Sequence, residues 1–479
     1  MVNIKFGTSG WRAIIGDEFT YDNVKLVSQA IADYINGRGS ASEKRSVLVG
    51  YDPRFLSEEF AKLSSCVLAA NNIKALYTVR DVPTPLISYE IIRGKLAGGI
   101  NFTASHNPPE YNGLKFSPDS GGPAMPETTK AIEESCKILQ NDRSKIKEIS
   151  WEEGLKKKLI EEIDPKPVYI KRIKELVDFK AVKKAKLKVG IDLLYGAARG
   201  YLDTLLKETG CKLEVIHDYR DPLFGGGRPE PDAQRLEGLS KIVTKNKLNL
   251  GLSCDGDADR FGILDCDGTY ITPNEVIALL LYSLAKSRNW KGIVARSCMT
   301  THLIDAIAKK FGIEVKETPV GFKYIGDIMV NRPKEFIIGG EESGGLTIRG
   351  HVPEKDGILA CLLMAEMAAI EKKSFKKIFA DIEKLVGKFI TTRKNLTVKP
   401  EIMTKFKDSI QAKAPKEFAG IKVKELNTLD GFKFILEDGS WVGMRLSGTE
   451  PLVRLYFESN SQQKIETIQK DTEKIIAAL

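Results

Sequence analysis

Hydrophobic and polar positions along the chain follow two alternating patterns, which predict helices and strands in turn. Val24, Val27, Ile31 and Ile35 recur every three or four residues on one helical face, after Thr20 as a candidate N-cap. Apolar runs of strand length lie at 46–52, 97–102, 186–192, 249–254, 292–297 and 335–340. The repeated alternation of strand and helix predicts an α/β fold.

The alternation changes twice along the chain, and these changes suggest domain boundaries. A polar segment of mixed charge at about 140–175 predicts a linking helix. From about residue 390 the pattern is that of a small α+β unit, with a hairpin at 432–446 that turns at Asp438-Gly439. We therefore predict three consecutive α/β domains with mixed sheets and a smaller C-terminal α+β domain. The predicted ranges are 1–150, 165–265, 266–385 and 390–479.

Composition places this chain among ordinary globular proteins. Its 479 residues contain no apolar stretch near membrane-spanning length, and the N-terminus lacks the pattern of a secretory signal. The seven cysteines are widely spaced, which favours reduced thiols in the cytoplasm over disulfides or a zinc site. The net charge of +9 is small, and the lysines are interleaved with acids. We therefore expect neither nucleic acid nor a membrane as a partner.

Polar motifs follow several of the predicted strands, where ligand sites lie in open α/β sheets. The first is TASHNP at 103–108, in which Ser105 is either a turn residue or a nucleophile and phosphate carrier. His106 and Lys115 are titratable groups nearby. The Gly-x-Ser-x-Gly elbow of α/β-hydrolases is missing, which disfavours a hydrolase serine.

The second motif, DGDADR, places three carboxylates at alternate positions, on Asp255, Asp257 and Asp259. Close carboxylates repel one another unless a cation lies among them, and hard oxygen ligands favour Mg²⁺, Mn²⁺ or Ca²⁺. An EF-hand is excluded because its sixth position would be Arg260 and its twelfth Cys266. A metal site is the favoured interpretation, and a solvated acidic turn is the alternative.

The third motif, GEESGG at 340–345, combines glycines with groups that bind sugar hydroxyls, on Glu341 and Ser343. A plain tight turn would have the same residues. His351 and Lys355 follow in HVPEKDG, which by itself also suits a charged surface turn or a helix cap. We treat both as candidate substrate ligands.

The fourth motif, RLSGTEP at 445–451, has the hydroxyls, backbone N–H groups and guanidinium groups of a phosphate cradle. A hairpin with incidental charge is the alternative. Near the start, Gly7-Thr8-Ser9-Gly10 with Arg12 has similar chemistry. By contrast, GGGRPEP at 225–231 lacks the context of a dinucleotide-binding loop, and the chain has no P-loop motif.

Together and in this order, the motifs resemble those of the α-D-phosphohexomutase superfamily, of the phosphoglucomutase/phosphomannomutase type. The matching segments are FGTSGWR, TASHNP, DGDADR, GEESGG and RLSGTEP. The resemblance spans nearly the whole chain. It implies four domains around a central cleft, three with an α/β core and a smaller α+β domain at the end.

The resemblance also implies a role for each candidate residue. Ser105 would carry the phosphate, and its oxygen would bind Mg²⁺ together with Asp255, Asp257 and Asp259. Arg260 and Arg12 would steady the reacting phosphoryl group, and Lys115 or His106 would act as acid and base, with Lys115 preferred. The implied substrate ligands are Glu341, Ser343, His351 and Lys355 for the sugar end, and Arg445, Ser447, Gly448, Thr449 and Arg454 for the non-reacting phosphate.

The implied activity interconverts hexose 1-phosphates and 6-phosphates through a hexose 1,6-bisphosphate that serves as intermediate and activator. The GEESGG loop resembles that of glucose-preferring members more than the GEQSGH loop of phosphoglucosamine mutases, and mannose stays open as a second sugar. Alternatives are a phosphoglucosamine mutase, a phosphopentomutase, a phosphatase or a non-enzymatic sugar-phosphate binder. We expect small sugar phosphates as partners and a monomer or a dimer.

Overall fold

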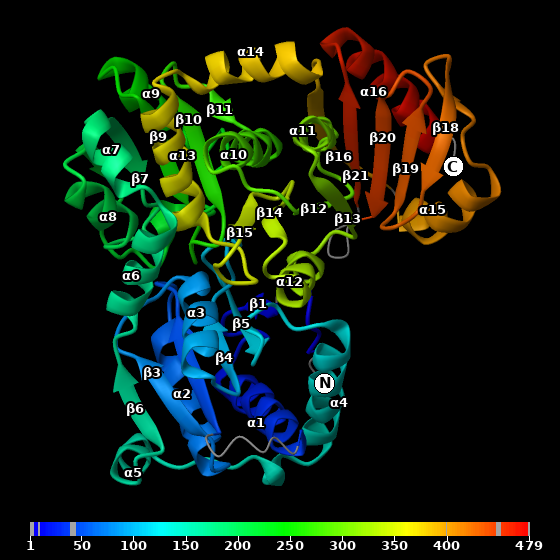
Figure 1. The fold of residues 1–479 in the computed structure, drawn as a ribbon. Coiled ribbons are helices and arrows are strands. Elements are labelled where there is room, and N and C mark those ends of the chain that lie inside the picture. The colour runs from blue at the N-terminus through cyan, green and yellow to red at the C-terminus, as the bar shows by residue number, and fades with distance from the viewer. Residues whose placement is uncertain (1–3, 8–9, 39–44, 399, 447–451, 478–479) are drawn as a thin grey trace. The chain divides into compact units, whose positions relative to one another are not determined.

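The computed structural model describes residues 4–7, 10–38, 45–398, 400–446 and 452–477. The chain divides into two compact units, and Figure 1 labels its helices and strands. The first comprises Met1–Val276 and Gly321–Phe375, and the second comprises Ile277–Val320 and Lys376–Leu479. Within the described residues, none of the helices combines the length and apolar character that a membrane crossing needs.

The first unit begins with a six-stranded mixed sheet in the order β1-β5-β4-β2-β3-β6. Its strands are β1 (Trp11–Ile14), β2 (Ser46–Tyr51), β3 (Lys74–Thr78), β4 (Gly98–Phe102), β5 (Tyr111–Pro118) and β6 (Ile160–Ile163). The accompanying helices are α1 (Tyr21–Gly37), α2 (Ser57–Ala70), α3 (Thr84–Gly94), α4 (Pro126–Asn141) and α5 (Trp151–Lys156). The predicted N-cap is confirmed, since the Thr20 hydroxyl accepts a hydrogen bond from the Asn23 N–H at 3.3 Å.

The predicted linking helix at 140–175 is wrong. The segment contains the short helix α5, the strand β6 and the start of a further helix, α6 (Lys166–Leu176). Lys158 has a left-handed φ of 57°, which ends the helical path, and Ile160 then pairs with Ala75 in parallel to β3. Ile160 is buried in the core, so long-range pairing decides this segment against its charge pattern.

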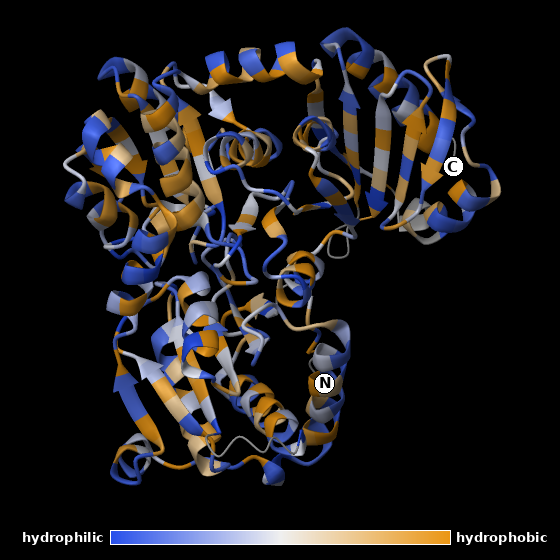
Figure 2. Ribbon diagram, in the orientation of Figure 1, coloured by the Kyte–Doolittle hydropathy of each residue, from blue (hydrophilic) through white to orange (hydrophobic). Residues whose placement is uncertain are grey.

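A second mixed sheet of the first unit has the order β11-β10-β9-β7-β8. It consists of β7 (Lys188–Asp192), β8 (Lys212–Ile216), β9 (Leu250–Cys254), β10 (Phe261–Asp265) and β11 (Tyr270–Ile271). Its helices include α7 (Phe179–Ala185), α8 (Leu202–Glu208), α9 (Glu237–Lys245) and α13 (Gly357–Glu371). Most of α13 is buried, and Figure 2 shows hydrophobic colour along most of its length. The same unit contains α12 (Phe322–Asn331) and the antiparallel pair β14 (Phe336–Glu341) and β15 (Gly345–Ile348).

The second unit contains a parallel strand pair and the C-terminal sheet. The pair is β12 (Ile293–Ser297) and β13 (Glu314–Thr318), joined by α11 (Leu303–Phe311). Helices α10 (Pro273–Ser287) and α14 (Phe375–Val386) each start within the first unit and continue into the second.

The C-terminal sheet has the order β16-β21-β20-β19-β18-β17 and is antiparallel. Its elements are β16 (Ile390–Thr397), α15 (Pro400–Ala412), β17 (Glu417–Phe418), β18 (Ile421–Asn427), β19 (Phe432–Leu436), β20 (Trp441–Leu446), β21 (Leu452–Ser459) and α16 (Gln462–Ala477). The hairpin predicted at 432–446 is confirmed, with Gly439 at a φ of 86° in its turn. The predicted class, α/β domains with mixed sheets and a last α+β domain, is therefore confirmed.

Candidate active site

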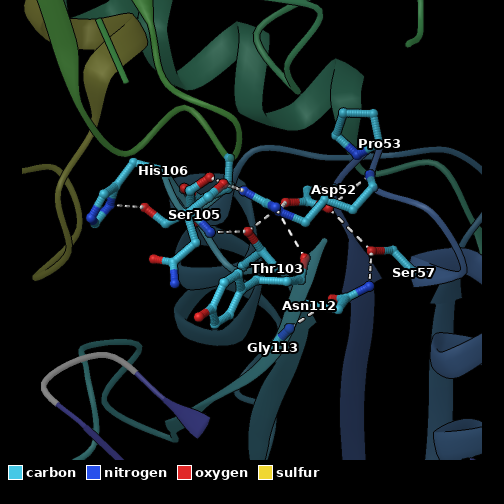
Figure 3. Close-up of polar contacts among 12 residues, drawn as sticks. Asp52, Pro53, Ser57, Thr103, Ser105, His106, Asn112 and Gly113 are labelled. Carbon is cyan, nitrogen blue, oxygen red and sulfur yellow. Dashed lines mark hydrogen bonds and ion pairs between the residues drawn. The ribbon is translucent and has the colours of Figure 1, made fainter. Parts of the chain in front are cut away.

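Ser105 lies in the loop between β4 and β5, in the first unit. Its side chain is buried, and its Oγ donates a hydrogen bond to Asp255 Oδ2 at 2.8 Å. His106 Nδ1 lies 3.3 Å from the same Oγ (Figure 3). The structure thus brings together a serine and a carboxylate that are 150 positions apart in sequence.

Asp255, Asp257 and Asp259 form the loop between β9 and β10, and all three are buried. One carboxylate oxygen of each lies within 4.8 Å of the others. Lys115 on β5 donates to Asp257 Oδ2 at 2.6 Å and to Asp259 Oδ2 at 2.8 Å, and Lys355 lies 2.9 Å from the latter oxygen. The loop is therefore a cluster of buried charges held by two lysines.

The cluster fits a bound cation. Asp257 Oδ1 and Asp259 Oδ1 are buried without a hydrogen-bond partner among the described residues, which is costly unless another group binds them. Three carboxylates with hard oxygen atoms suit a divalent ion such as Mg²⁺. Burial and the two neighbouring carboxylates raise the pKa of Asp255 well above its usual range, so a positive charge among the three would be favourable.

The charge of Lys115 is set by the same cluster. Burial favours the neutral amine, but the adjacent Asp257 and Asp259 outweigh it and raise the pKa of Lys115. By contrast, burial together with Arg260 and Arg12 lowers the pKa of His106 well below its usual range. The structure therefore holds Lys115 as a cation and His106 as a neutral ring.

Two arginines lie beside this cluster. The Arg260 N–H donates to Asp255 Oδ1 at 2.9 Å, and its guanidinium donates to Glu230 Oε1 at 2.7 Å. Arg12 on β1 donates to Asn107 Oδ1 at 2.8 Å. Glu230 also lies 3.7 Å from His106 Nε2 and was not a sequence candidate. Glu230 belongs to the GGGRPEP segment, and the feature of the sequence that could have indicated it is a carboxylate between two prolines.

Asp52 and Arg54 are further residues that the sequence analysis missed. They follow β2 directly, and their ion pair at 3.1 Å is fully buried. Thr84, at the start of α3, donates to Asp257 Oδ2 at 2.5 Å. The available signal for Asp52 and Arg54 was charge placed directly after an apolar strand, the same signal that drew attention to the other motifs.

The GEESGG segment forms the turn between β14 and β15. Glu341 Oε1 accepts a hydrogen bond from the Gly321 N–H at 2.7 Å, and burial together with Glu342 raises the pKa of Glu341 to about 7. Ser343 is half-buried in the turn. Both side chains lie in the first unit with the carboxylate cluster.

The side chain of His351 is fully buried, and it contacts other interior residues. Its Nε2 lies 2.7 Å from Asp356 Oδ2, and the Tyr169 hydroxyl donates to the same oxygen at 2.6 Å. Asp356 also caps α13 by accepting from the Leu359 N–H at 2.8 Å. The structure thus gives His351 an interior contact, and a contact with substrate stays a prediction.

The proposed phosphate cradle lies in the second unit. Arg445 on β20 lies opposite Arg454 on β21 in the antiparallel strand register. Its Nε donates to Asp430 Oδ1 at 3.0 Å. Arg454 Nε is buried without a hydrogen-bond partner among the described residues. The predicted ligands Ser447, Gly448 and Thr449 lie outside the described residues, as do Thr8 and Ser9.

Comparisons with known proteins agree with this geometry. Family profiles for phosphoglucomutase/phosphomannomutase match the chain four times: alpha/beta/alpha domain I at 3–143, domain II at 167–268, domain III at 272–385 and the C-terminal domain at 401–475. The domain ranges predicted from sequence are not tested by these matches and stay a prediction.

Similar proteins cover nearly the whole chain. A phosphoglucomutase/phosphomannomutase of Thermococcus kodakarensis is 32% identical over 96% of this chain and 95% of its own. A phosphoglucosamine/phosphogalactosamine mutase of Sulfurisphaera tokodaii is 29% identical over 98% of both. A crystal structure from Thermus thermophilus, provisionally assigned as a phosphomannomutase, matches with a TM-score of 0.84 and 31% identity over 99% of both chains. These relatives support a mutase of the isomerase class, and the chain belongs to the phosphoglucomutase/phosphomannomutase family of the α-D-phosphohexomutase superfamily.

Proposed function

We propose that this protein interconverts hexose 1-phosphates and 6-phosphates through a phosphoserine at Ser105 and a hexose 1,6-bisphosphate intermediate. The observation that carries the proposal is the 2.8 Å hydrogen bond from Ser105 Oγ to Asp255 Oδ2. It places a serine hydroxyl against a buried carboxylate cluster with unsatisfied oxygens. A phosphoryl group on this oxygen would lie beside the cluster.

The proposed cofactor is Mg²⁺, held by Asp255, Asp257, Asp259 and an oxygen of the phosphorylated Ser105. When bound, Mg²⁺ would offset the negative charge that spreads over a phosphoryl group in transfer. The two unsatisfied oxygens, Asp257 Oδ1 and Asp259 Oδ1, support these ligands.

The protein's own groups supply positioning and proton transfer. In the first half-reaction the bond between phosphorus and Ser105 Oγ breaks, and a bond forms from phosphorus to the free sugar hydroxyl. Lys115 can accept the proton of that hydroxyl only after its amine has given up its own proton, and His106, held as a neutral ring, is the alternative acceptor. Arg260 and Arg12 stabilise the phosphoryl oxygens. After the bisphosphate reorients, the reverse transfer of its other phosphate restores phosphoserine.

The proposed substrate is glucose phosphate first and mannose phosphate second. Glu341 and Ser343 would bind hydroxyls that the two sugars share, so the preference should amount to ~1–3 kcal/mol of transition-state binding. Arg445, Ser447, Gly448, Thr449 and Arg454 would hold the non-reacting phosphate, and Lys355 and His351 would complete the sugar end. We propose sugar phosphates as the only class of partner, in the cytoplasm, with the protein a monomer or a dimer.

The test is direct. After incubation with glucose 1,6-bisphosphate, peptide mass spectrometry should find one phosphate, on Ser105, and Ser105→Ala should abolish both the label and turnover. Ser117→Ala, which removes a hydroxyl from β5 of the same sheet, is the matched control and should keep both. Full turnover by Ser105→Ala would refute the mechanism, and net release of inorganic phosphate would indicate a phosphatase. A panel of glucose, mannose, glucosamine and ribose 1-phosphates, compared by kcat/KM, decides the sugar.

A further inference from the structure

Arg54 is buried, and its guanidinium binds the backbone of the loop that contains Ser105. One terminal nitrogen donates to the carbonyl oxygens of Ser105 at 2.6 Å and Asn107 at 2.7 Å. The other donates to those of Pro108 at 2.8 Å and Tyr111 at 3.0 Å. Because Nε also donates to Asp52, all five N–H donors of the guanidinium have acceptors.

Asp52 connects this arginine to Ser105 by a second path. Its Oδ2 accepts from Arg54 Nε at 3.1 Å and from the Thr103 hydroxyl at 2.6 Å. Thr103 Oγ1 in turn accepts from the Ser105 N–H at 2.8 Å. The other oxygen of Asp52, Oδ1, accepts from the Arg54 N–H at 3.0 Å and from the Ser57 hydroxyl at 3.1 Å. The N–H and the C=O of Ser105 are therefore both tied to the end of β2.

These two ties hold Ser105 in an unusual conformation. Its φ is 53°, in the left-handed region, which costs a residue with a Cβ atom ~1–2 kcal/mol. Strain of this kind persists only where the surroundings impose it. A Cβ atom on Gly256 would lie 2.6 Å from the Ser105 carbonyl oxygen, so the loop between β9 and β10 packs directly on the atom that Arg54 binds. Phe224 lies 4.9 Å from the guanidinium and covers it.

We propose that Arg54 is a positioning residue for phosphoryl transfer at Ser105. Its guanidinium N–H groups are all used on protein acceptors, so it would act on the reaction through Ser105. Its four carbonyl contacts and the Asp52–Thr103 path hold Ser105 in the left-handed conformation that places Oγ 2.8 Å from Asp255. This inference rests on the proposed phosphoserine mechanism. Without these contacts the Ser105 loop would relax. A misplacement of about 1 Å in a reacting group costs on the order of 10²-fold in rate.

Arg54→Lys is the main variant, because it keeps the charge beside Asp52 but cannot reach four carbonyls. We expect kcat to fall ~10²-fold while the KM for glucose 1-phosphate changes less than about threefold. Phosphorylation of Ser105 by glucose 1,6-bisphosphate, followed in a single turnover, should slow by the same factor. Mn²⁺ binding should not change. Arg349→Lys is the matched control, since Arg349 also binds a backbone carbonyl, that of Phe336 at 2.7 Å, and should keep wild-type kcat.

Thr103→Val keeps the inference testable if Arg54→Lys does not fold. It removes only the hydroxyl between Asp52 and the Ser105 N–H, and we expect a loss of about tenfold in kcat with KM unchanged, the scale of one buried hydrogen bond. Wild-type kcat in Arg54→Lys, or in Thr103→Val where the lysine variant does not fold, overturns the inference. A loss of Mn²⁺ binding together with kcat would show a structural role and overturn it too. If wild-type protein is active without phosphate on Ser105, the proposed function fails instead.

Discussion

Replacing Gly345 with alanine tests how the site is packed around Lys355. Gly345 begins β15, directly after the turn of the GEESGG segment. A Cβ atom there would lie 2.1 Å from Lys355 Cδ and 2.4 Å from Cγ, far inside van der Waals contact. These atoms are in the middle of the lysine chain, so the whole side chain must move. The movement would carry the Lys355 amine away from Asp259 Oδ2, which now lies 2.9 Å from it.

The expected size of the effect follows from two terms. Overpacking a well-filled interior costs ~1–3 kcal/mol. Leaving a buried charge without a partner costs ~3–5 kcal/mol, but Asp259 keeps Lys115 at 2.8 Å, so only part of that cost applies. We therefore expect Gly345→Ala to lower the free energy of unfolding by about 2 kcal/mol. An equal loss of transition-state binding would lower kcat/KM by about 30-fold.

The assay compares kcat/KM for glucose 1-phosphate and the urea midpoint of Gly345→Ala with those of the wild type. Gly238→Ala is the control, because Gly238 lies in α9 with nothing within 4 Å of an added Cβ. That change should leave kcat/KM unaltered and raise helix stability by up to ~1 kcal/mol. Wild-type kcat/KM and an unchanged midpoint in Gly345→Ala would refute the reasoning that Lys355 occupies this space.

Asp257→Asn should lower Mn²⁺ affinity, measured by titration calorimetry, and Mg²⁺-dependent turnover by at least ~10–100-fold. Full turnover by the unmutated protein after verified metal removal would contradict the metal role. Glu230→Gln removes the charge that holds Arg260 at 2.7 Å, so kcat should fall about tenfold with little change in the urea midpoint; unchanged kcat would count against this role. Burial, with Lys433 nearby, lowers the pKa of His302 to about 3, so the unfolded chain takes up a proton that the folded chain excludes between pH 6.5 and 3. The free energy of unfolding should thus fall as pH drops through this window, by about 2 kcal/mol at pH 5. If His302→Asn shows the same dependence of this free energy on pH as the wild type, the prediction is wrong.

Local chemistry along the chain determined much of the fold. The Thr20 cap, the turn at Gly439 and the alternation of strands with helices depend on residues near one another in sequence, and the structure confirms them. The ordered motifs likewise identified the family. Ser105 and the Asp255 loop were visible because each follows an apolar strand. The roles of the candidate residues stay predictions.

Tertiary structure decided what depends on partners distant in sequence. Strand β6 exists because Ile160 pairs with Ala75, and a run of mixed charge cannot report that pairing. The position of Arg54 after a strand does not reveal its partner, because its contact with the carbonyl oxygen of Ser105 joins positions 51 residues apart. Gly345 and Lys355 share space that only side-chain packing reveals. Capping, turns and periodicity could be predicted from the residues alone, because these depend on local backbone geometry. The fold decided which buried charges meet, because burial and partner choice depend on the whole packed interior.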